Sequence, residues 1–488
     1  MRWNAWMALV TTTLVGQLLW IFLLRGPRIL DSDLTLILGE LLLGMCVIGI
    51  AQLIATTPVN AIKLTLPNSR MIIIGGSVLL HFWAILLLWP ALSSDVTRYR
   101  LDGLTWLTGR SPYAVTPRQM LKTPNVDAID RTLPGNDSYS IFPPVAQTVF
   151  IAARAIEMAV VGPAKLSYDR PEVAVRRWRP ALPYLSFRHR AIVLRAIFSI
   201  AAVGCTCVLL SLLKHTHRTP WLAVLFAWNP LVILETAGSP HVDIVGVLLL
   251  LVMLRMIQKS NFSLATLALC LACGVKPMAI LLAPLLIQKI DDRHDWKVAQ
   301  RSIGVALLTL GAVFVPILLV QHGYRGWIVQ LNAYAHLRET NSLLFAVAKS
   351  VVGASWITGN ARPFFLLLAP LAAASVLLWM IKKRWPIEDA GYWLMLVVLV
   401  FSPASQPWSL VWPLCFVPVM RLSRGWSALA WTATITISYA AWHQASWNVP
   451  ARIVIAEYVP VLVAMGIEIS DLRQRYAALA AATASASV

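Results

Sequence analysis

An acidic residue stands where an apolar run long enough to cross a membrane ends. Asp95 follows the run 71–91 and lies at the start of the longest polar connection of the chain, 92–140. A carboxylate at the boundary between membrane and water can meet a lipid-bound substrate and a water-soluble partner together, and it can take a proton from a hydroxyl group. Asp is also favoured at the start of a helix, where it caps free amides. Position alone therefore leaves a general base and a helix cap as alternatives.

A second group of polar residues interrupts later apolar runs. It consists of Asn229, His241, Asp243 and Lys276, the last within the sequence Gly-Val-Lys-Pro at 274–277. Ionisable side chains at membrane depth are candidates for function. Asp243 could instead cap a helix, and Lys276 could extend to the membrane surface. His-x-Asp supplies two metal ligands without a third, so a divalent metal is possible but not indicated.

The connection after Asp95 carries further candidates. They are Arg98, Tyr99, Asp102, Tyr113 and Tyr139, and Arg338, in a later polar connection expected at 321–341, is another cation that could reach the same side. A base would remove a proton from an acceptor, and the cations would stabilise a departing phosphate. Neither a G-x-x-x-x-G-K-[ST] loop nor a G-x-G-x-x-G turn is present, so no soluble nucleotide site is expected. The combination suits transfer from a lipid phosphate.

The composition places these residues in a membrane protein. Of 488 residues, 58% are hydrophobic and 13% are charged, whereas soluble proteins carry about 25% charged residues. We therefore predict an all-α polytopic membrane protein with a single multi-pass domain over residues 1–488. The formal net charge is +19, but the basic residues lie between apolar runs, where they anchor a chain at anionic lipid headgroups. A lipid bilayer, and no nucleic acid, is the expected partner.

Apolar runs near 20 residues predict about 11–14 membrane crossings. The runs are 4–24, 34–55, 71–91, 191–213, 221–235, 242–257, 302–320, 363–381, 427–443 and 453–468, and Asn229-Pro230 interrupts the run 221–235. Two more, 262–288 and 391–420, should break at 274–277 and 402–407, and 342–352 should enter the membrane without crossing. Within the domain we distinguish an outer loop region at 92–190, a helical module at 191–320 and a C-terminal helical region at 321–488.

The distribution of Lys and Arg predicts the orientation, because these residues are enriched in cytoplasmic loops. It places the N-terminus in the cytoplasm and 92–140 on the outer side. The connection 162–190 opposes this assignment, because it carries seven basic residues. We therefore expect 142–161, which contains Arg154 and Glu157, to lie flat on the outer leaflet rather than to cross. The alternative is a crossing that brings 162–190 into the cytoplasm.

The order of these motifs resembles the GT-C superfamily of membrane glycosyltransferases, and within it the polyprenyl-phosphate-mannose-dependent mannosyltransferases. The resemblance covers roughly residues 70 to 290. It rests on Asp95 after a membrane helix, Tyr99, Gly109-Arg-Ser-Pro-Tyr113, Pro143-Pro144, Trp228-Asn-Pro230, Gly238-Ser-Pro-His-Val-Asp243 and Gly274-Val-Lys-Pro277. This chain departs from the group in Ser239-Pro240 and in the long basic connection at 162–190.

The resemblance implies a helical bundle whose first outer loop carries juxtamembrane helices, in a plasma membrane, with the active site on the extracytoplasmic side. The donor would be a hexose, with mannose favoured, on a polyprenyl phosphate, and the acceptor a glycan or glycolipid. Asp95 would be the base of an inverting transfer that needs no cofactor. Lys276, Arg98 and Arg338 would face the donor phosphate, and Tyr99, Asp102, Tyr113, Tyr139, Asn229, His241 and Asp243 would contact substrate.

Two other classes remain open from the sequence. A transporter or a lipid-linked sugar flippase would place essential charges near the midplane and open alternately to the two sides. A glycan polymerase or ligase would use a lipid diphosphate donor in place of a monophosphate. The concentration of unusual polar residues at one face favours the transferase.

Overall fold

The chain folds as a helical bundle. The computed structural model describes residues 2–25, 33–56, 68–90, 92–120, 137–161, 191–337, 340–352, 362–443 and 449–486, together with Lys122 and Val126. The regular secondary structure within these ranges is helical. An isolated β-bridge pairs Thr340 with Ala404. The predicted all-α fold of a polytopic membrane protein is confirmed.

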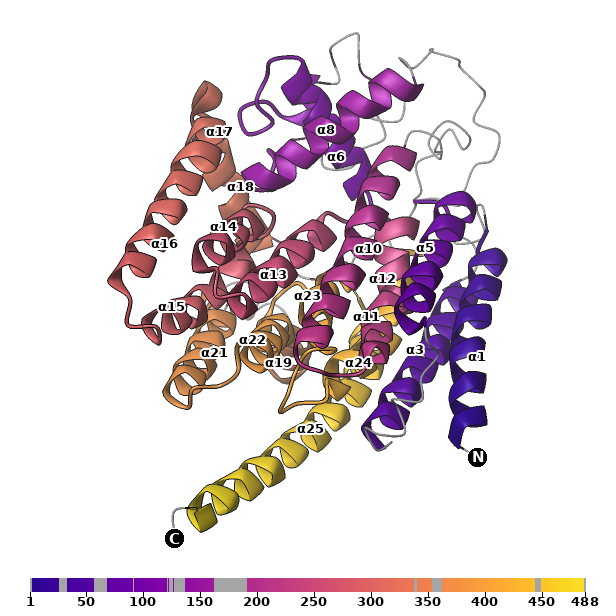
Figure 1. Ribbon diagram of the computed structural model, residues 1–488. Coiled ribbons are helices and arrows are strands. Elements are labelled where there is room, and N and C mark those ends of the chain that lie inside the picture. The colour runs from indigo at the N-terminus through magenta and orange to yellow at the C-terminus, as the bar shows by residue number, and fades with distance from the viewer. Residues whose placement is uncertain are drawn as a thin grey trace.

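Apolar helices form the body of the molecule (Figure 1). They are α1 (Arg2–Leu23), α3 (Asp33–Thr56), α5 (Ser69–Leu87), α10 (Ile192–His215), α13 (Asp243–Gln258), α14 (Phe262–Cys273), α21 (Arg362–Lys382), α22 (Ile387–Phe401), α24 (Trp426–Thr434) and α25 (Ala451–Ala486). Helix α10 packs against α5 and α13, and α24 packs against α3 and α25. Large apolar side chains such as Leu42, Met71 and Leu462 remain exposed. Such outward-facing residues are expected where lipid replaces water.

Five described helices are long and apolar enough to cross a membrane: Leu34–Thr56, Ser69–Leu87, Ile192–His215, Trp296–Ala333 and Ala451–Arg475. A sixth arises if Pro220–Ala227 and Pro230–Gly238, bent by 54°, form one span. The sequence predicted about 11–14 crossings. The counts differ because other apolar runs fold as shorter helices of 10–17 residues, such as Phe262–Cys273 and Leu367–Lys382, or break at prolines.

The breaks predicted from Gly and Pro are confirmed. The first separates η2 (Pro220–Ala223) and α11 (Val224–Ala227) from α12 (Pro230–Ile233) and the π-helical turn η3 (Leu234–Gly238). There the Asn229 side chain accepts the Leu231 N–H at 3.1 Å, and proline follows at the first helical position, where its missing N–H costs nothing. The break at 274–277 is followed by η4 (Pro277–Leu282) and α15 (Ala283–Asp291), and the break at 402–407 by η8 (Pro407–Leu410) and α23 (Val411–Leu414).

A layer of shorter helices covers one end of the bundle (Figure 1). It contains α6 (Asp95–Leu107), α7 (Pro117–Met120) and α8 (Pro144–Val161). Helix α6 packs on α8 so closely at Gly103 that a Cβ there would lie 2.4 Å from the Phe150 carbonyl oxygen. Arg100 donates to Glu157 at 2.8 Å and Arg154 donates to the same carboxylate at 2.9 Å.

Helix α8 lies across the bundle, as expected for 142–161, but its charged residues Arg154 and Glu157 are buried in the protein. Figure 1 shows α8 running across the end of the bundle instead of along α1 and α5, and α8 is not among the helices that qualify as spans. We expected a position on the membrane surface to accommodate Arg154 and Glu157. Both are buried, with 3% and 2% exposure, because they neutralise one another beneath α6. The basic connection 162–190 lies outside the described residues.

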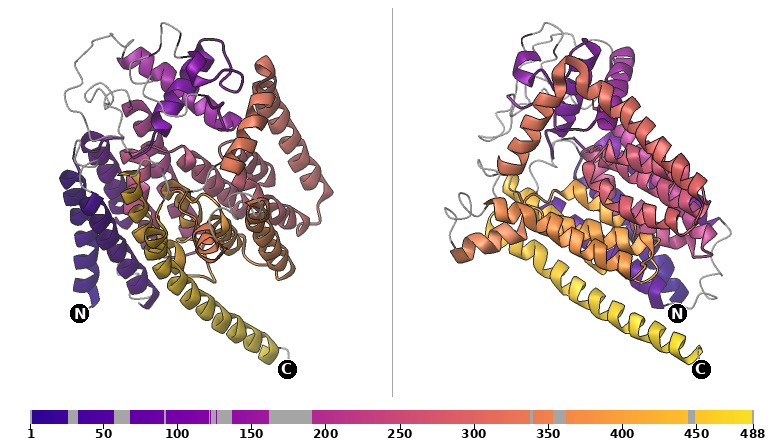
Figure 2. Two further views of the ribbon diagram at one scale, coloured as in Figure 1. Left: turned by 180° about the vertical axis from the view of Figure 1, so that it is seen from behind. Right: turned by 90° about the vertical axis from the view of Figure 1, so that its left-hand side faces the viewer.

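A helical hairpin stands beside this layer (Figure 2). Its first arm comprises α16 (Trp296–Thr309), η5 (Leu310–Phe314), α17 (Val315–Leu319) and η6 (Val320–His322), and its second is α18 (Gly323–Leu337). The chain turns at Gln321, whose φ of 53° lies in the left-handed region. Trp327 donates to the Ile141 carbonyl at 3.1 Å. We expected a polar connection at 321–341, but most of it is helix α18. Two further elements complete the described fold, α19 (Leu343–Val352) and η9 (Ile435–His443).

Candidate active site

Helix α6 presents Asp95 at its first turn. The helix is capped by Ser94, which makes no side-chain capping bond, so Asp95 does not occupy the cap position that the sequence left open. Its backbone N–H donates to Ser93 Oγ at 3.0 Å, and the Tyr99 hydroxyl donates to Asp95 Oδ2 at 3.4 Å. The Asp95 side chain is 27% exposed. A reactant can therefore reach its carboxylate.

A buried histidine lies behind Asp95. His241 Nε2 is 3.9 Å from Asp95 Oδ2, and His241 Nδ1 is 2.9 Å from Glu235 Oε2. The other oxygen of Glu235 accepts the Tyr439 hydroxyl at 2.6 Å. The imidazole also stacks on Trp408, with ring centroids 3.9 Å apart. These contacts connect Asp95 through His241 to a buried carboxylate.

The charges around His241 favour its protonated form. Burial lowers the pKa of His241, but the hydrogen bond and charge of Glu235, followed by the charges of Asp95 and Asp243, raise the pKa above its usual value. Burial and the charges of the same two aspartates raise the pKa of the Tyr99 hydroxyl well above its usual range. Tyr99 therefore stays a neutral donor toward Asp95.

Lys276 meets Asp243 at the break after α14. Its Nζ lies 2.5 Å from Asp243 Oδ1 and 3.0 Å from Ser409 Oγ. Trp412 Nε1 donates to the same Asp243 oxygen at 2.7 Å. The Lys276 side chain is 30% exposed, and its two contacts use two of three ammonium hydrogens. The ion pair with Asp243 offsets the free-energy cost of placing a cation in an apolar segment. The ammonium group of Lys276 remains accessible to a ligand.

The break that carries Lys276 is joined to the layer that carries Asp95. The Val145 and Ala146 N–H groups donate to the Gly274 carbonyl at 2.8 and 3.1 Å. These amides belong to the first turn of α8, where backbone donors have no partner within their own helix. The join sets the position of Lys276 relative to α6, because α8 packs on α6.

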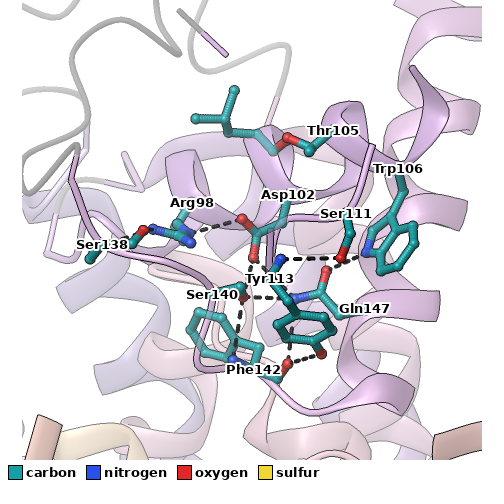
Figure 3. A network of polar contacts seen from close by, with 11 residues as sticks. Arg98, Asp102, Thr105, Trp106, Ser111, Tyr113, Ser138, Ser140, Phe142 and Gln147 are labelled. Atoms are coloured by element: carbon teal, nitrogen blue, oxygen red, sulfur yellow. Dashed lines mark hydrogen bonds and ion pairs between the residues drawn. The ribbon is translucent and has the colours of Figure 1, made fainter. Parts of the chain in front are cut away.

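Arg98 and Asp102 lie in a separate buried network (Figure 3). Asp102 accepts from Arg98 Nε at 2.9 Å, from Ser140 Oγ at 2.5 Å and from Gln147 Nε2 at 3.1 Å. Arg98 also donates to the Ser138 carbonyl at 2.9 Å. Arg98 is 9% exposed and Asp102 is 2% exposed. These contacts indicate that Arg98 and Asp102 hold residues 138–147 against α6. The sequence had instead predicted that Arg98 contacts the donor phosphate and that Asp102 contacts substrate.

The remaining predicted residues have different surroundings. The Tyr113 hydroxyl donates to the Phe142 carbonyl at 2.5 Å, and Tyr139 is half-buried beside α18. Asn229 is fully buried and donates to Thr432 Oγ1 at 3.3 Å, so it stabilises the helix break. Arg338 lies outside the described residues. The structure thus brings together Asp95, Tyr99, His241, Asp243 and Lys276.

Several partners of this group were not predicted as site residues. They are Glu235, Trp408, Ser409, Trp412 and Tyr439. An acidic residue inside an apolar run was the one available signal, and it applied to Glu235. The others are ordinary residues of apolar segments. Among the residues that the structure describes, no group of three or more His, Cys, Asp or Glu side chains is arranged to hold a metal ion.

Comparison with known proteins was consistent with the resemblance expected from the motifs. Residues 162–290 match the family model described as alpha-(1->6)-mannopyranosyltransferase, N-terminal domain. The chain is also 23% identical over 240 residues to alpha-(1->6)-mannopyranosyltransferase A of Mycobacterium tuberculosis (strain ATCC 25618 / H37Rv), a match that covers 45% of each protein. The match therefore spans about half the length of that curated relative. Asn229, His241, Asp243 and Lys276 lie within the family match, and Asp95 precedes it.

Proposed function

We propose that this protein is a membrane glycosyltransferase that moves a mannose from a polyprenyl-phosphate carrier to a glycan or glycolipid acceptor. The observation that carries the proposal is the accessible Asp95 carboxylate, which lies beside a buried His241–Glu235 pair and on the same side of the fold as the Lys276–Asp243 pair. The similarity to mannopyranosyltransferases supports the reaction class and the sugar.

In the proposed reaction Asp95 is the general base. Its carboxylate takes the proton of an acceptor hydroxyl as the hydroxyl oxygen bonds to the anomeric carbon of the donor. The bond from that carbon to the phosphate oxygen breaks, and the electron pair leaves with the lipid phosphate. Attack opposite the leaving group inverts the anomeric centre. Protonated His241 stabilises the ionised form of Asp95 before the transfer.

Lys276 is proposed to receive the negative charge that develops on the phosphate. Asp243 and Ser409 orient its ammonium group, and we assign its third hydrogen to a phosphate oxygen of the donor. A cation fixed in advance stabilises a departing anion without reorganisation during the reaction. Trp412 donates to the Asp243 oxygen that Lys276 contacts, so it holds that carboxylate in place while the donor binds.

We further propose that the α6–α8 layer faces the extracytoplasmic side of a plasma membrane. The Lys and Arg bias of the connections supports this orientation. An acceptor glycan would then approach from water, and the polyprenyl chain would stay in the bilayer. Lipid-linked donor and soluble acceptor meet at Asp95 in this arrangement.

The test is reconstitution of the purified protein with a panel of polyprenyl-phosphate sugars, beginning with mannose, and a membrane glycan extract. We expect sugar transfer by the wild type and a loss of about a hundredfold or more in kcat/KM for Asp95→Asn. Asp137→Asn is the matched control. Its carboxylate lies on the same layer in an exposed pair with Arg118, so transfer should be unchanged.

Other results would redirect the proposal. Equal transfer by wild type and a folded Asp95→Asn protein would remove Asp95 from the mechanism. Transfer only from diphosphate donors would indicate a glycan polymerase or ligase. Movement of lipid-linked sugar across vesicles without a covalent product would indicate a flippase.

A further inference from the structure

A basic cavity lies at the opposite end of the bundle from Asp95. Its volume is about 450 Å³, and it is bordered by the end of α3, the connection after α10, the connection before α24, and α25. Asp95 belongs to the layer at the other end of these helices (Figure 1). The cavity therefore has no part in the proposed transfer, and its ligand is independent of that function.

Cationic side chains converge on this cavity. Arg218, Arg421, Arg424 and Arg475 line it together with His217, and none of the lining residues that the structure describes is Asp or Glu. Four permanent positive charges therefore share one small space.

Three carboxylates near the wall, Asp389, Glu388 and Asp471, offset part of this charge, and Asp471 interacts electrostatically with Arg475 on the same helix. Asp389 is occupied by the backbone, because it accepts the N–H groups of Arg421, Leu422 and Ser423 at 2.9, 2.9 and 2.8 Å. Glu388 Oε1 lies 3.6 Å from a terminal nitrogen of Arg421, too far for a strong hydrogen bond. The cavity keeps an excess of positive charge that an anionic ligand would match.

Two of the guanidinium groups are held in place by backbone carbonyls. Arg218 donates to the Met420 carbonyl at 2.7 Å, and Arg475 donates to the Leu422 carbonyl at 3.1 Å. Carbonyl groups orient a guanidinium but carry no net charge. The guanidinium has five N–H donors, so most of them remain for an anion. Fixed guanidinium forks of this kind match the oxygens of a phosphate.

Most of the remaining cavity wall is apolar. Ile54, Leu222, Leu225, Val417 and Trp426 line it beside the arginines. Helix α3, which ends at the cavity, faces lipid along its length, since Leu38, Leu42 and Met45 are 46%, 62% and 58% exposed. A ligand with a phosphate group and an apolar chain fits both parts, whereas free phosphate would leave the apolar wall unused.

We infer that this cavity binds the phosphate headgroup of an anionic membrane lipid, with its acyl chain along α3. The arginines form charge-assisted bonds to the phosphate, and the apolar wall takes the first part of the chain. A general attraction of basic loops to anionic membranes would need neither a cavity nor fixed guanidinium groups.

The experiment compares lipid retention by the full-length protein purified in detergent. Phosphatidylglycerol or phosphatidylcholine is added, and bound lipid is counted by native mass spectrometry. Arg421→Gln with Arg424→Gln is the test variant, because neither side chain is the one that holds a backbone carbonyl in the cavity wall. Lys382→Gln with Lys383→Gln is the control, since these exposed lysines lie outside the cavity and the change in charge is equal. Size-exclusion profile and thermal unfolding confirm that each variant is folded.

We expect the wild type to retain phosphatidylglycerol and not phosphatidylcholine. The cavity variant should lose about tenfold or more of that affinity, as expected for lost charge-assisted bonds, and the control should stay within about twofold. Equal losses in the two variants would overturn the inference in favour of diffuse attraction. Stabilisation against heat by inorganic phosphate equal to that by phosphatidylglycerol would overturn the assignment to a lipid.

Discussion

At the residue scale, the two aspartates of helix α6, Asp95 and Asp102, differ in their contacts. Asp95 is 27% exposed and its phenol contact is 3.4 Å long, whereas Asp102 is buried with donors from Arg98, Ser140 and Gln147. A base must change its protonation state during a reaction, and a residue held by several strong donors resists that change. The contacts therefore favour Asp95 over Asp102 as the proposed base, and they favour Asp102 as a support of the layer.

Asp102→Ala tests this division. It leaves the buried Arg98 guanidinium without its anion, so we expect the protein to lose about 3 kcal/mol or more of stability. Thermal unfolding in detergent measures the loss. Asp137→Ala removes an equal charge from a pair whose side chains are 66% and 67% exposed, and it should cost less than about 1 kcal/mol. Similar losses of stability in both variants would mean that the buried Asp102 network stabilises the fold no more than an exposed ion pair does.

His241 should make stability depend on pH. Its folded-state pKa is raised above the usual 6.5, since the effects of Glu235, Asp95 and Asp243 exceed that of burial. Its proton therefore stabilises the fold fully below about pH 6.5, and this contribution is lost as the pH rises through the raised pKa. The melting temperatures of wild type and His241→Gln, followed between about pH 5 and 9, should differ most at the acidic end. Parallel curves would contradict the raised pKa.

At the element scale, the position of Lys276 depends on how α13 packs. A Cβ at Gly246 would lie 2.5 Å from the Trp412 ring, whose indole N–H holds Asp243. Gly246→Ala should displace that ring and cost about 1–3 kcal/mol from overpacking, and it should raise the KM for the donor because Lys276 moves. Gly304→Ala in α16 meets nothing within 4 Å. It should leave both quantities unchanged or slightly improve stability, and an equal effect of the two changes would refute the packing argument.

The helix breaks were the most predictable elements. Asn229-Pro230 and residues 274–277 and 402–407 combine missing backbone donors with turn-forming residues, and these effects act within a few positions. Helix α18 was not predicted, because its polar side chains resemble those of a loop. It gains stability from contacts that a local pattern does not contain, such as the bond from Trp327 to Ile141.

At the scale of the whole molecule, the two ends of the bundle should be accessible from opposite sides of the membrane. Asp137 lies on the layer with Asp95, and Asp292 lies in the connection between α15 and α16. We expect Asp137→Cys to react with a membrane-impermeant maleimide in right-side-out vesicles and Asp292→Cys to react only in inverted vesicles. The unsubstituted protein controls for the native cysteines. Labelling of both positions from one side would contradict the orientation.

The clustering of Asp95, His241, Asp243 and Lys276 was predictable from the order of the apolar runs, because alternate helix ends share a face. The identity of their supports was not. Glu235 depends on Tyr439, and Asp243 depends on Trp412, through contacts between segments far apart in the chain. Arg98 and Asp102 form an ion pair across one turn of α6. The sequence alone does not distinguish such a structural pair from two residues that bind a substrate.

The bond between Tyr439 and Glu235 also has a consequence for biosynthesis. It joins residues 204 positions apart, and the chain is synthesised from its N-terminus onward. Asp95, His241 and Lys276 are therefore all synthesised, and their helices inserted, before Tyr439 exists. We expect a nascent chain to contain Asp95 and His241 while the buried end of the His241–Glu235 pair is still incomplete. The enzyme would gain activity only after residue 439 has been synthesised, and a fragment that ends before η9 would carry the proposed base without a finished site.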